Sequence, residues 1–252
     1  MQLQDKVAIV TGAARGLGRA YAEAMASEGA AIVACDINDC SETVAAIEAA
    51  GGRAVTAVTD IANMASCEAM AGLAVQEFGK IDVLVNNAAL YAGLKGARFE
   101  NLDEAQWDAV MNINVKGLWQ SCKAVVEPMR AAGGGSIINI ASLAAVYGLP
   151  YGLDYVASKA AVIGMTRGMA RELGGDKIRV NAVAPSAVLT EGTTEFFGEK
   201  LEKAKSVIAS GQVIQRNLET CDLTGTIVYL ASDNSAFVTG QTHMVDGGSW
   251  FL

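Results

Sequence analysis

The sequence predicts an α/β fold in a single domain, built on a doubly wound, seven-stranded parallel sheet with helices on both faces. Short apolar runs alternate with longer helical patterns along the whole chain, and this alternation is typical of βαβ units joined by right-handed crossovers. Hydrophobic residues make up 52% of the 252 residues, which suits strands that are buried on both faces. No linker or repeat interrupts the pattern, so residues 1–252 are expected to fold as one domain.

The individual elements follow from the same runs. Apolar, β-branched segments predict strands at residues 6–10, 31–35, 53–58, 81–85, 136–140, 178–183 and 242–245. Patterns with a helical period predict helices at residues 16–28, 41–50, 64–78, 104–131, 153–173 and 219–231. The segment at about 189–213 breaks the alternation and carries Phe196 and Phe197. We interpret this segment as a lid over the substrate, and a docked pair of surface helices is the alternative.

A glycine-rich turn directly follows the first predicted strand. Residues 11–18 read TGAARGLG and open an alanine-rich helical pattern. Glycine lets the backbone approach a pyrophosphate, and the free N–H groups at a helix N-terminus attract the same anion. The turn therefore predicts a dinucleotide site that includes Gly12, Arg15, Gly16, Leu17 and Gly18.

An acidic residue ends the second predicted strand. Asp36 follows the apolar run 31–35 and stands eighteen residues after Gly18. A carboxylate at this place accepts hydrogen bonds from a ribose diol and repels a 2′-phosphate. Asp36 therefore predicts NAD as the cofactor.

A tyrosine and a lysine stand four residues apart in the helix predicted at 153–173. At this spacing Tyr155 and Lys159 share one helix face, roughly 5–6 Å apart at Cβ. A nearby cation favours the phenolate and lowers the pKa of a tyrosine, so the pair is a candidate acid/base. An isolated pair of this kind is more often an ordinary surface Tyr and Lys. Here the other motifs of the chain favour a catalytic role for the pair.

Several motifs in the right order make the chain resemble the short-chain dehydrogenase/reductases of the single-domain type. Residues 11–18 match TGxxxGxG, residues 86–89 match NNAG, residues 185–190 match PGxIxT, and residues 245–248 match the usual ending. The resemblance runs essentially from residue 6 to residue 248. It implies a Rossmann fold and hydride transfer between a nicotinamide and a CH–OH or C=O group.

The resemblance also implies a catalytic set and its roles. Tyr155 would give or take the oxygen-bound proton, while Lys159 would lower the Tyr155 pKa and hold the nicotinamide ribose. Ser142 would hydrogen-bond the substrate oxygen, and Asn114 would hold a water that links Lys159 to solvent. Besides the glycine turn, cofactor contacts are implied for Asp36, Asp60, Ile61, Asn87, Ala88, Ala89, Tyr155, Lys159, Pro185, Ser186, Val188 and Thr190.

Three positions depart from the family pattern or compete with it. Ala89 replaces the last glycine of NNAG and Ser186 replaces the glycine of PG, so each adds a Cβ beside the expected nicotinamide. Arg15 stands where a basic residue can meet the 2′-phosphate in NADP-preferring relatives. It competes with Asp36 as a specificity signal, and NAD is expected because a 2′-phosphate beside Asp36 would place like charges together.

Composition argues against several other classes of protein. A net charge of −8 disfavours binding to nucleic acid or anionic membranes. The longest uncharged run, residues 131–153, contains three consecutive glycines and Pro150 and does not predict a membrane span. The five cysteines form no CxxC pair, so we expect neither a metal site nor disulfides, and a cytoplasmic location. Polar residues 2–6 run straight into the first strand, and no signal peptide is expected.

The helix predicted at 153–173 also suggests an oligomer. It is apolar nearly all round, so one side is expected to meet the sheet and the other a partner chain. The family commonly pairs this helix in a dimer and doubles the dimer into a tetramer with D2 symmetry. A homotetramer is therefore expected.

Apolar residues near the expected catalytic set predict a hydrophobic secondary alcohol or ketone as the substrate, aryl or alicyclic. An apolar pocket suits a hydrophobic ligand with one polar handle. The residues expected to line it are Leu90, Tyr91, Leu94, Leu143, Val146, Tyr147, Leu149, Tyr151, Leu153, Phe196 and Phe197.

Four alternatives remain open at this point. A 3-oxoacyl-carrier-protein reductase would need a basic patch at the pocket mouth, and a polyol or sugar dehydrogenase would need a more polar pocket. A non-catalytic NAD(H)-binding regulatory protein is the alternative from a different class. A serine hydrolase is disfavoured because no GxSxG elbow is present and the sole histidine, His243, lies in the last predicted strand.

Overall fold

The computed structural model describes residues 1–251, and within them one parallel sheet has the strand order β3-β2-β1-β4-β5-β6-β7. The strands are β1 (Val7–Thr11), β2 (Ala31–Asp36), β3 (Arg53–Val58), β4 (Val83–Asn86), β5 (Gly135–Ile140), β6 (Ile178–Pro185) and β7 (Thr242–Val245). From β1 the chain builds β2 and β3 toward one edge of the sheet, and it then builds β4 to β7 toward the other edge. The carboxyl ends of β1 and β4 therefore flank the switch point, where open α/β sheets bind ligands.

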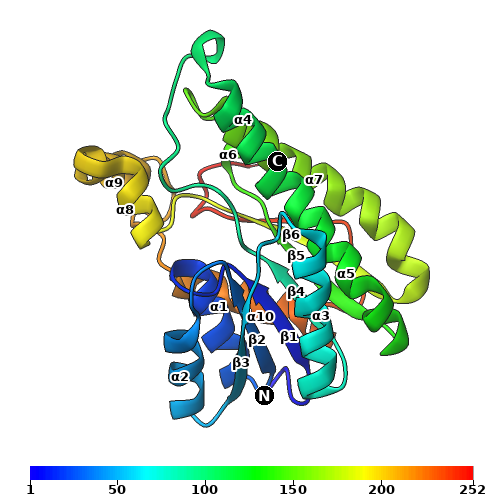
Figure 1. Ribbon diagram of the computed structural model, residues 1–252. Coiled ribbons are helices and arrows are strands. Elements are labelled where there is room, and N and C mark those ends of the chain that lie inside the picture. The colour runs from blue at the N-terminus through cyan, green and yellow to red at the C-terminus, as the bar shows by residue number, and fades with distance from the viewer. Residues whose placement is uncertain (252) are drawn as a thin grey trace.

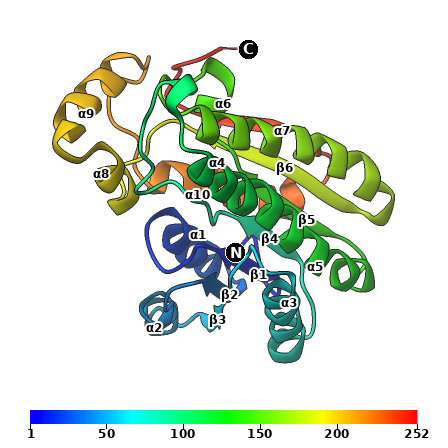
Figure 2. The ribbon, with the colours of Figure 1, turned by 45° about the horizontal axis from the view of Figure 1, so that its top comes forward.

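Helices cover both faces of the sheet (Figure 1). One face is covered by α1 (Gly16–Ser27), α2 (Ser41–Ala49) and α10 (Cys221–Ala231). The other is covered by α3 (Met64–Phe78), α5 (Leu118–Ala131) and α7 (Leu153–Leu173), with α4 (Glu104–Met111) beside α7 (Figure 2). Short turns of helix complete the chain at η1 (Phe99–Asn101), η2 (Asn112–Gly117), α6 (Ala144–Tyr147), η3 (Gly174–Asp176) and η5 (Asp233–Ser235).

Two apolar layers, one on each side of the sheet, form the core. Successive residues of a strand point to opposite faces, and β1 shows the consequence directly. Its Ala8 and Val10 pack among residues of α1 and α10, whereas Ile9 packs among residues of α3 and α5. Because both sides of β1 are apolar, all five of its residues are buried.

The predicted fold class is confirmed, and each predicted strand is present with its ends shifted by no more than two residues. The helix predicted at 104–131 is different, because a π-helical turn, η2, separates α4 from α5. Gly117 ends this turn against Ile61, where an added Cβ would lie 2.9 Å from the Ile61 side chain. The helical period of the sequence did not reveal this turn.

The segment at 189–213 forms α8 (Glu191–Phe197), η4 (Gly198–Lys200) and α9 (Leu201–Ser210), which stand apart from the helices that cover the sheet (Figure 1, yellow). Its two ends meet, because Val188 pairs with Leu218 and the N–H of Leu189 donates to the Leu218 carbonyl at 3.0 Å. The segment is thus an excursion from the carboxyl end of β6 that returns close to its starting point.

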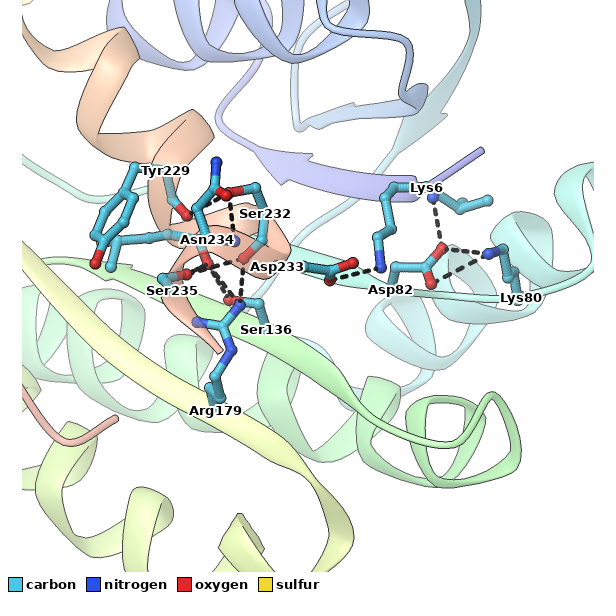
Figure 3. Close-up of polar contacts among 12 residues, drawn as sticks. Lys6, Lys80, Asp82, Ser136, Arg179, Tyr229, Ser232, Asp233, Asn234 and Ser235 are labelled. Carbon is cyan, nitrogen blue, oxygen red and sulfur yellow. Dashed lines mark hydrogen bonds and ion pairs between the residues drawn. The ribbon is translucent and has the colours of Figure 1, made fainter. Parts of the chain in front are cut away.

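Ion pairs and hydrogen bonds connect the amino-terminal ends of the strands with the segments around them (Figure 3). Asp82 accepts from the Val7 N–H at 2.7 Å and from Lys80, and Lys6 pairs with Asp233 at 3.1 Å. Arg179 donates to the Leu230 carbonyl at 2.9 Å, at the C-terminal end of α10. These contacts anchor strands and α10 at the edge opposite to the predicted ligand site.

The uncharged run at 131–153 is divided between the buried strand β5 and the short helix α6. Within residues 1–251, none of the helices combines the length and the apolar character that a membrane crossing requires.

Candidate functional site

A cavity of about 670 Å³ opens at the carboxyl ends of β4, β5 and β6, below α8 and α9. Segments far apart in the sequence meet around it, including the glycine turn, the loop after β4 and the start of α7. The predicted site residues that line it are Leu17, Asn87, Ala89, Ser142, Tyr155, Lys159, Pro185, Ser186, Val188 and Thr190. The structure therefore brings most of the predicted set to one place.

The glycine turn is locked to the loop after β4. The Thr11 hydroxyl accepts from the N–H groups of Asn87 and Ala88, both at 3.1 Å. The Asn87 side-chain amide donates to the carbonyls of Thr11 at 3.0 Å and Gly12 at 3.2 Å. A Cβ on Gly18 would lie 2.0 Å from the Gly12 carbonyl oxygen, so only glycine permits this close approach.

The same turn fits the pyrophosphate of a dinucleotide. Gly12 and Gly16 have φ of +68° and +58°, which glycine adopts without strain. The residue before α1, Arg15, offers no side-chain cap, so the first N–H groups of the helix stay available to an anion. The donors and the space present here match the cofactor that the sequence implies.

Asp36 is held beside the glycine turn. One oxygen accepts from the Ala14 N–H at 3.2 Å, and the other accepts from the backbone and side-chain nitrogens of Asn38, both at 3.0 Å. A carboxylate fixed at the end of β2 is in the place where a ribose diol is recognised. Asp60 is exposed and accepts from the Ala62 N–H at 2.9 Å, while Ile61 beside it is buried.

Arg15 points to a partner that the sequence did not suggest. Its guanidinium forms a two-point ion pair with Glu195 of α8, at 2.6 Å and 3.2 Å. The expectation was a contact between Arg15 and the cofactor, and the structure instead shows the charge of Arg15 engaged by the segment at 189–213.

Tyr155, Ser142 and Lys159 form a polar cluster inside the apolar cavity. The Ser142 hydroxyl accepts from the Ala144 N–H at 3.2 Å, and Ser142 lines the same cavity as Tyr155. The Lys159 ammonium donates to the Ile140 carbonyl at 2.7 Å and lies 5.8 Å from the centre of the Tyr155 ring. The helical spacing of α7 and the end of β5 thus bring the proposed acid/base pair together with a serine hydroxyl.

Burial dominates the protonation of this cluster. Burial raises the pKa of Tyr155 to about 12, and Ser142 opposes that rise. Burial also lowers the pKa of Lys159, which is 5% exposed, to about 8. The Lys159 ammonium is directed to the Ile140 carbonyl, and a lowering of the Tyr155 pKa by Lys159 stays a prediction.

Asn114 lies in the π-helical turn η2, and its side chain is fully engaged. Its Oδ1 accepts from the Leu90 N–H at 2.7 Å, and its Nδ2 donates to the Leu90 carbonyl at 3.1 Å and to the Ser158 hydroxyl at 3.2 Å. The Asn114 side chain therefore holds the loop after β4 against α7. The relay water at Asn114 stays a prediction.

Ser186 presents a buried hydroxyl with no hydrogen-bond partner among the described residues 1–251. A buried hydroxyl without a partner is unfavourable unless a ligand supplies one. Ser186 and Ala89 both line the cavity, so the two departures from the family glycines lie at the same site. Pro185 ends β6 nearby, and the Thr190 hydroxyl caps the start of α8 by accepting from the Thr193 N–H at 3.3 Å.

The substrate side of the cavity is aromatic. Tyr91 stacks on Phe196 with ring centres 4.7 Å apart and lies 5.2 Å from Tyr155, and Phe197 meets Phe196 edge-on. Burial raises the pKa of Tyr91 well above its ordinary range, so its hydroxyl stays neutral. The predicted pocket residues that line the cavity are Tyr91, Leu143, Tyr147, Leu149, Phe196 and Phe197.

Five predicted pocket residues are not among those that line the cavity, namely Leu90, Leu94, Val146, Tyr151 and Leu153. Tyr151 and Leu153 are exposed on the outside of the loop that leads into α7. Four further residues line the cavity without having been named from the sequence, namely Ala204, Val207 and Ile208 of α9 and Trp250 near the C-terminus. The apolar positions 201, 204 and 208 have helical spacing and could have indicated the α9 contribution.

Comparison with known proteins places the chain among oxidoreductases. A family model described as enoyl-(acyl carrier protein) reductase matches residues 12–249. The 3-oxoacyl-[acyl-carrier-protein] reductase FabG of Thermotoga maritima is 39% identical over 98% of this chain and 99% of its own length. D-threitol dehydrogenase of Mycolicibacterium smegmatis is 38% identical, over 98% of this chain and 94% of its own.

Two further matches carry different substrates in their names. The (2S)-[(R)-hydroxy(phenyl)methyl]succinyl-CoA dehydrogenase subunit BbsD of Thauera aromatica is 39% identical over 98% of each chain. The crystal structure of carveol dehydrogenase from Mycobacterium avium in complex with NAD superposes with a TM-score of 0.93, at 30% identity and 98% coverage of both chains. Such names span thioesters, polyols and hydrophobic alcohols.

The depressed pKa of Lys159 predicts a specific pH dependence of stability. Between pH 8 and 10.5 Lys159 is protonated more often in the unfolded chain than in the folded protein. The free-energy cost of burying Lys159 therefore falls as the pH rises through this window. Relative to Lys159→Met, the wild-type free energy of unfolding should rise by about 3 kcal/mol from pH 8 to pH 10.5. Denaturant titrations at several pH values measure this difference.

The exposed residue Lys203 provides the control for that experiment. Lys203→Met should follow the wild-type pH profile, since its ammonium is hydrated in both states. If the free energy of unfolding depended on pH in the same way in the wild type and in Lys159→Met, the lowered pKa of Lys159 would be refuted.

Proposed function

The chain belongs to the short-chain dehydrogenase/reductase family, whose members act on CH–OH and C=O groups, and we propose that it is a NAD-dependent enzyme for hydrophobic secondary alcohols or ketones. The observation that carries this proposal is the cavity itself. It combines the Tyr155, Ser142 and Lys159 cluster with an aromatic wall, next to a glycine turn that fits a dinucleotide.

Tyr155 is proposed to move the proton on the substrate oxygen. When bound as NAD+, the nicotinamide would supply the hydride acceptor and a positive charge beside this phenol. In reduction the neutral Tyr155 donates its proton to the carbonyl oxygen, and in oxidation its phenolate removes the proton from the alcohol. Ser142 would hydrogen-bond the same substrate oxygen, because it lines the cavity together with Tyr155.

Lys159 and Asn114 are proposed to position this acid/base. The Lys159 ammonium is available to a ribose hydroxyl if it exchanges the Ile140 carbonyl for that partner. Asn114 fixes Leu90 and Ser158, and Ser158 directly precedes Lys159 in α7. This network keeps the loop after β4 and the Lys159 face of α7 in register.

Two contacts support NAD over NADP. Asp36 is fixed by Ala14 and Asn38 at the place of the ribose diol, where a 2′-phosphate would meet a like charge. Arg15, the nearby cation that could offset this repulsion, is paired with Glu195. Carveol dehydrogenase, which has a closely similar fold, is described in complex with NAD.

The aromatic wall and the segment at 189–213 support a hydrophobic substrate. Phe196 and Phe197 of α8 and Ile208 of α9 face the cavity, so this segment is proposed as the lid that excludes water. The 39% identical Thauera relative carries a phenyl carbinol in its substrate name, which favours an aryl alcohol.

A 3-oxoacyl-carrier-protein reductase is the second candidate, because the Thermotoga relative has that activity in its name. The acidic carrier protein would require positive charge at the cavity mouth. The helices α8 and α9 and the turn between them carry Lys200, Lys203 and Lys205 against Glu191, Glu195, Glu199 and Glu202. This segment over the cavity has no net positive charge, so the alcohol proposal is preferred.

A homotetramer is proposed from the outer face of α7. Its exposed positions include Ala160, Gly164 and Gly168, a stripe of small residues that lets a second helix approach closely. A Cβ added at Gly164 or Gly168 would meet nothing within 4 Å in the single chain.

Tyr155→Phe should reduce turnover by about 10²–10⁴-fold, because it removes the proton donor and keeps the ring. NADH binding, measured by fluorescence titration, should be retained. Tyr229→Phe on α10 is the matched control and should keep full turnover, since Tyr229 lies outside the cavity. Near-normal turnover of Tyr155→Phe would exclude Tyr155 as the acid/base.

A substrate panel tests the proposed chemistry. Initial rates of NAD+ and NADP+ reduction should be measured with aryl secondary alcohols, alicyclic alcohols, polyols and a 3-hydroxyacyl thioester. The highest kcat/KM is expected for an aryl or alicyclic alcohol with NAD+, because the cavity wall is aromatic and Asp36 opposes a 2′-phosphate. A thioester or a polyol as the best substrate would favour the alternatives.

The assembly is tested by light scattering at micromolar concentration, where a tetramer is expected. Gly164→Arg should lower the oligomeric state by placing a charged side chain in the α7 stripe. Gly72→Arg on α3 is the control, because Gly72 is also an exposed helical glycine with open space at its Cβ. A wild-type monomer, or equal effects of the two variants, would contradict the proposed interface.

A further inference from the structure

Arg15 and Glu195 form an ion pair that joins the glycine turn of the proposed cofactor site to α8. Arg15 belongs to the glycine turn and Glu195 to α8, 180 residues further along the chain. Both guanidinium Nη atoms donate, Nη1 to Oε1 at 2.6 Å and Nη2 to Oε2 at 3.2 Å. This two-point geometry uses the planar fork of arginine, the same fork that would bind a phosphate.

The charges of three carboxylates act on the Arg15 guanidinium. The hydrogen bonds that Arg15 donates to Glu195 raise the pKa of Arg15 most, and the charges of Glu191 and Asp36 raise it further. Glu191 also lies over the turn, because an added Cβ on Gly16 would be 3.6 Å from its carboxylate. Arg15 is therefore the cation in an acidic neighbourhood, and Glu195 holds its donors.

This neighbourhood is where NADP differs from NAD. Asp36 is placed to bind the ribose diol, so a 2′-phosphate on that ribose would meet the charge of Asp36 and, close to the same turn, the charge of Arg15. A free Arg15 would attract the phosphate. An Arg15 already bound in two places by Glu195 must first be released, and the phosphate would then remain beside the carboxylates of Asp36 and Glu195.

We propose that Glu195 is a specificity-determining residue that excludes NADP by occupying Arg15. The inference rests on the proposed NAD preference and explains how a chain with arginine in its glycine turn keeps that preference. It assigns part of the cofactor selectivity to the segment at 189–213, which also faces the substrate cavity. The residue acts through Arg15 and through its own negative charge, and it needs no contact with the nicotinamide.

The effect expected from Glu195 is moderate because the pair is partly exposed. Exposed ion pairs contribute up to about a fivefold factor in an equilibrium. Removing the Glu195 charge would end its competition for Arg15 and would also remove one like-charge repulsion of similar size. A gain on the order of tenfold in NADPH affinity is expected, with less than about a twofold change for NADH.

The test uses fluorescence titrations of the full chain with NADH and NADPH, which report binding without turnover. Glu195→Gln keeps the shape of the side chain and removes its charge. Glu199→Gln is the matched control, because Glu199 is an exposed glutamate of the same segment, in the turn η4 between α8 and α9. Glu195→Gln should tighten NADPH binding by the stated factor, and Glu199→Gln should leave both dissociation constants unchanged.

A double-mutant cycle shows whether the effect passes through Arg15. Arg15→Gln alone should change NADPH affinity little, because Arg15 is already occupied, whereas Arg15→Gln combined with Glu195→Gln should lose most of the gain. Unchanged NADPH affinity in Glu195→Gln would overturn the proposal. Equal tightening of both cofactors would also overturn it, since the pair would then only hold α8 in place.

The wild-type titration separates this inference from the proposed function. If the wild type binds NADPH more tightly than NADH, the proposed NAD preference fails and the explanation offered for it fails as well. If the wild type prefers NADH but Glu195→Gln does not shift the ratio, the NAD preference stands and only the role of Glu195 is refuted.

Discussion

The close contact between the glycine turn and the loop after β4 is the constraint on which the rest of the site depends. Asn87 donates two hydrogen bonds to Thr11 across the switch point of the sheet, and Gly18 lies where any Cβ would clash with the Gly12 carbonyl. This packing brings the carboxyl ends of β1 and β4 together. The groove for a dinucleotide and the position of the residues after Asn87 both follow from it.

From that contact, hydrogen bonds lead to the proposed acid/base. The chain after Asn87 reaches Leu90, which the Asn114 side chain holds through both its N–H and its carbonyl. Asn114 then contacts Ser158 in α7, between Tyr155 and Lys159. The π-helical turn that contains Asn114 is the local departure from regular helix that accompanies this placement, and such turns are frequent at functional sites.

Two regions of the site differ in their electrostatics: the buried groups inside the cavity, whose neutral forms are favoured, and the carboxylates near Arg15 at its rim. Inside the cavity, burial favours the neutral form of Tyr155 and destabilises the charged form of Lys159. The destabilised ammonium lies close to the proposed acid/base. At the rim, Glu195 pairs with Arg15, and the charges of Glu191 and Asp36 also act on it. The segment at 189–213 takes part in both regions, since Phe196 lines the cavity and Glu195, its neighbour, binds the glycine turn.

The sequence by itself determined the fold class, the strand positions and the residue types at the site, because these depend on local periodicity and on short motifs whose residues are close in the chain. The spacing of Tyr155 and Lys159 and the glycine turn needed only helix geometry and backbone sterics. Tertiary structure decided what depends on distant contacts and burial. The partner of Arg15 lies 180 residues away, α9 and Trp250 reach the cavity only after the chain folds back, and Leu153 turns outward although it is next to the site in sequence. The pKa values of Tyr155 and Lys159 likewise depend on how much water the assembled core removes, which no spacing in the sequence specifies.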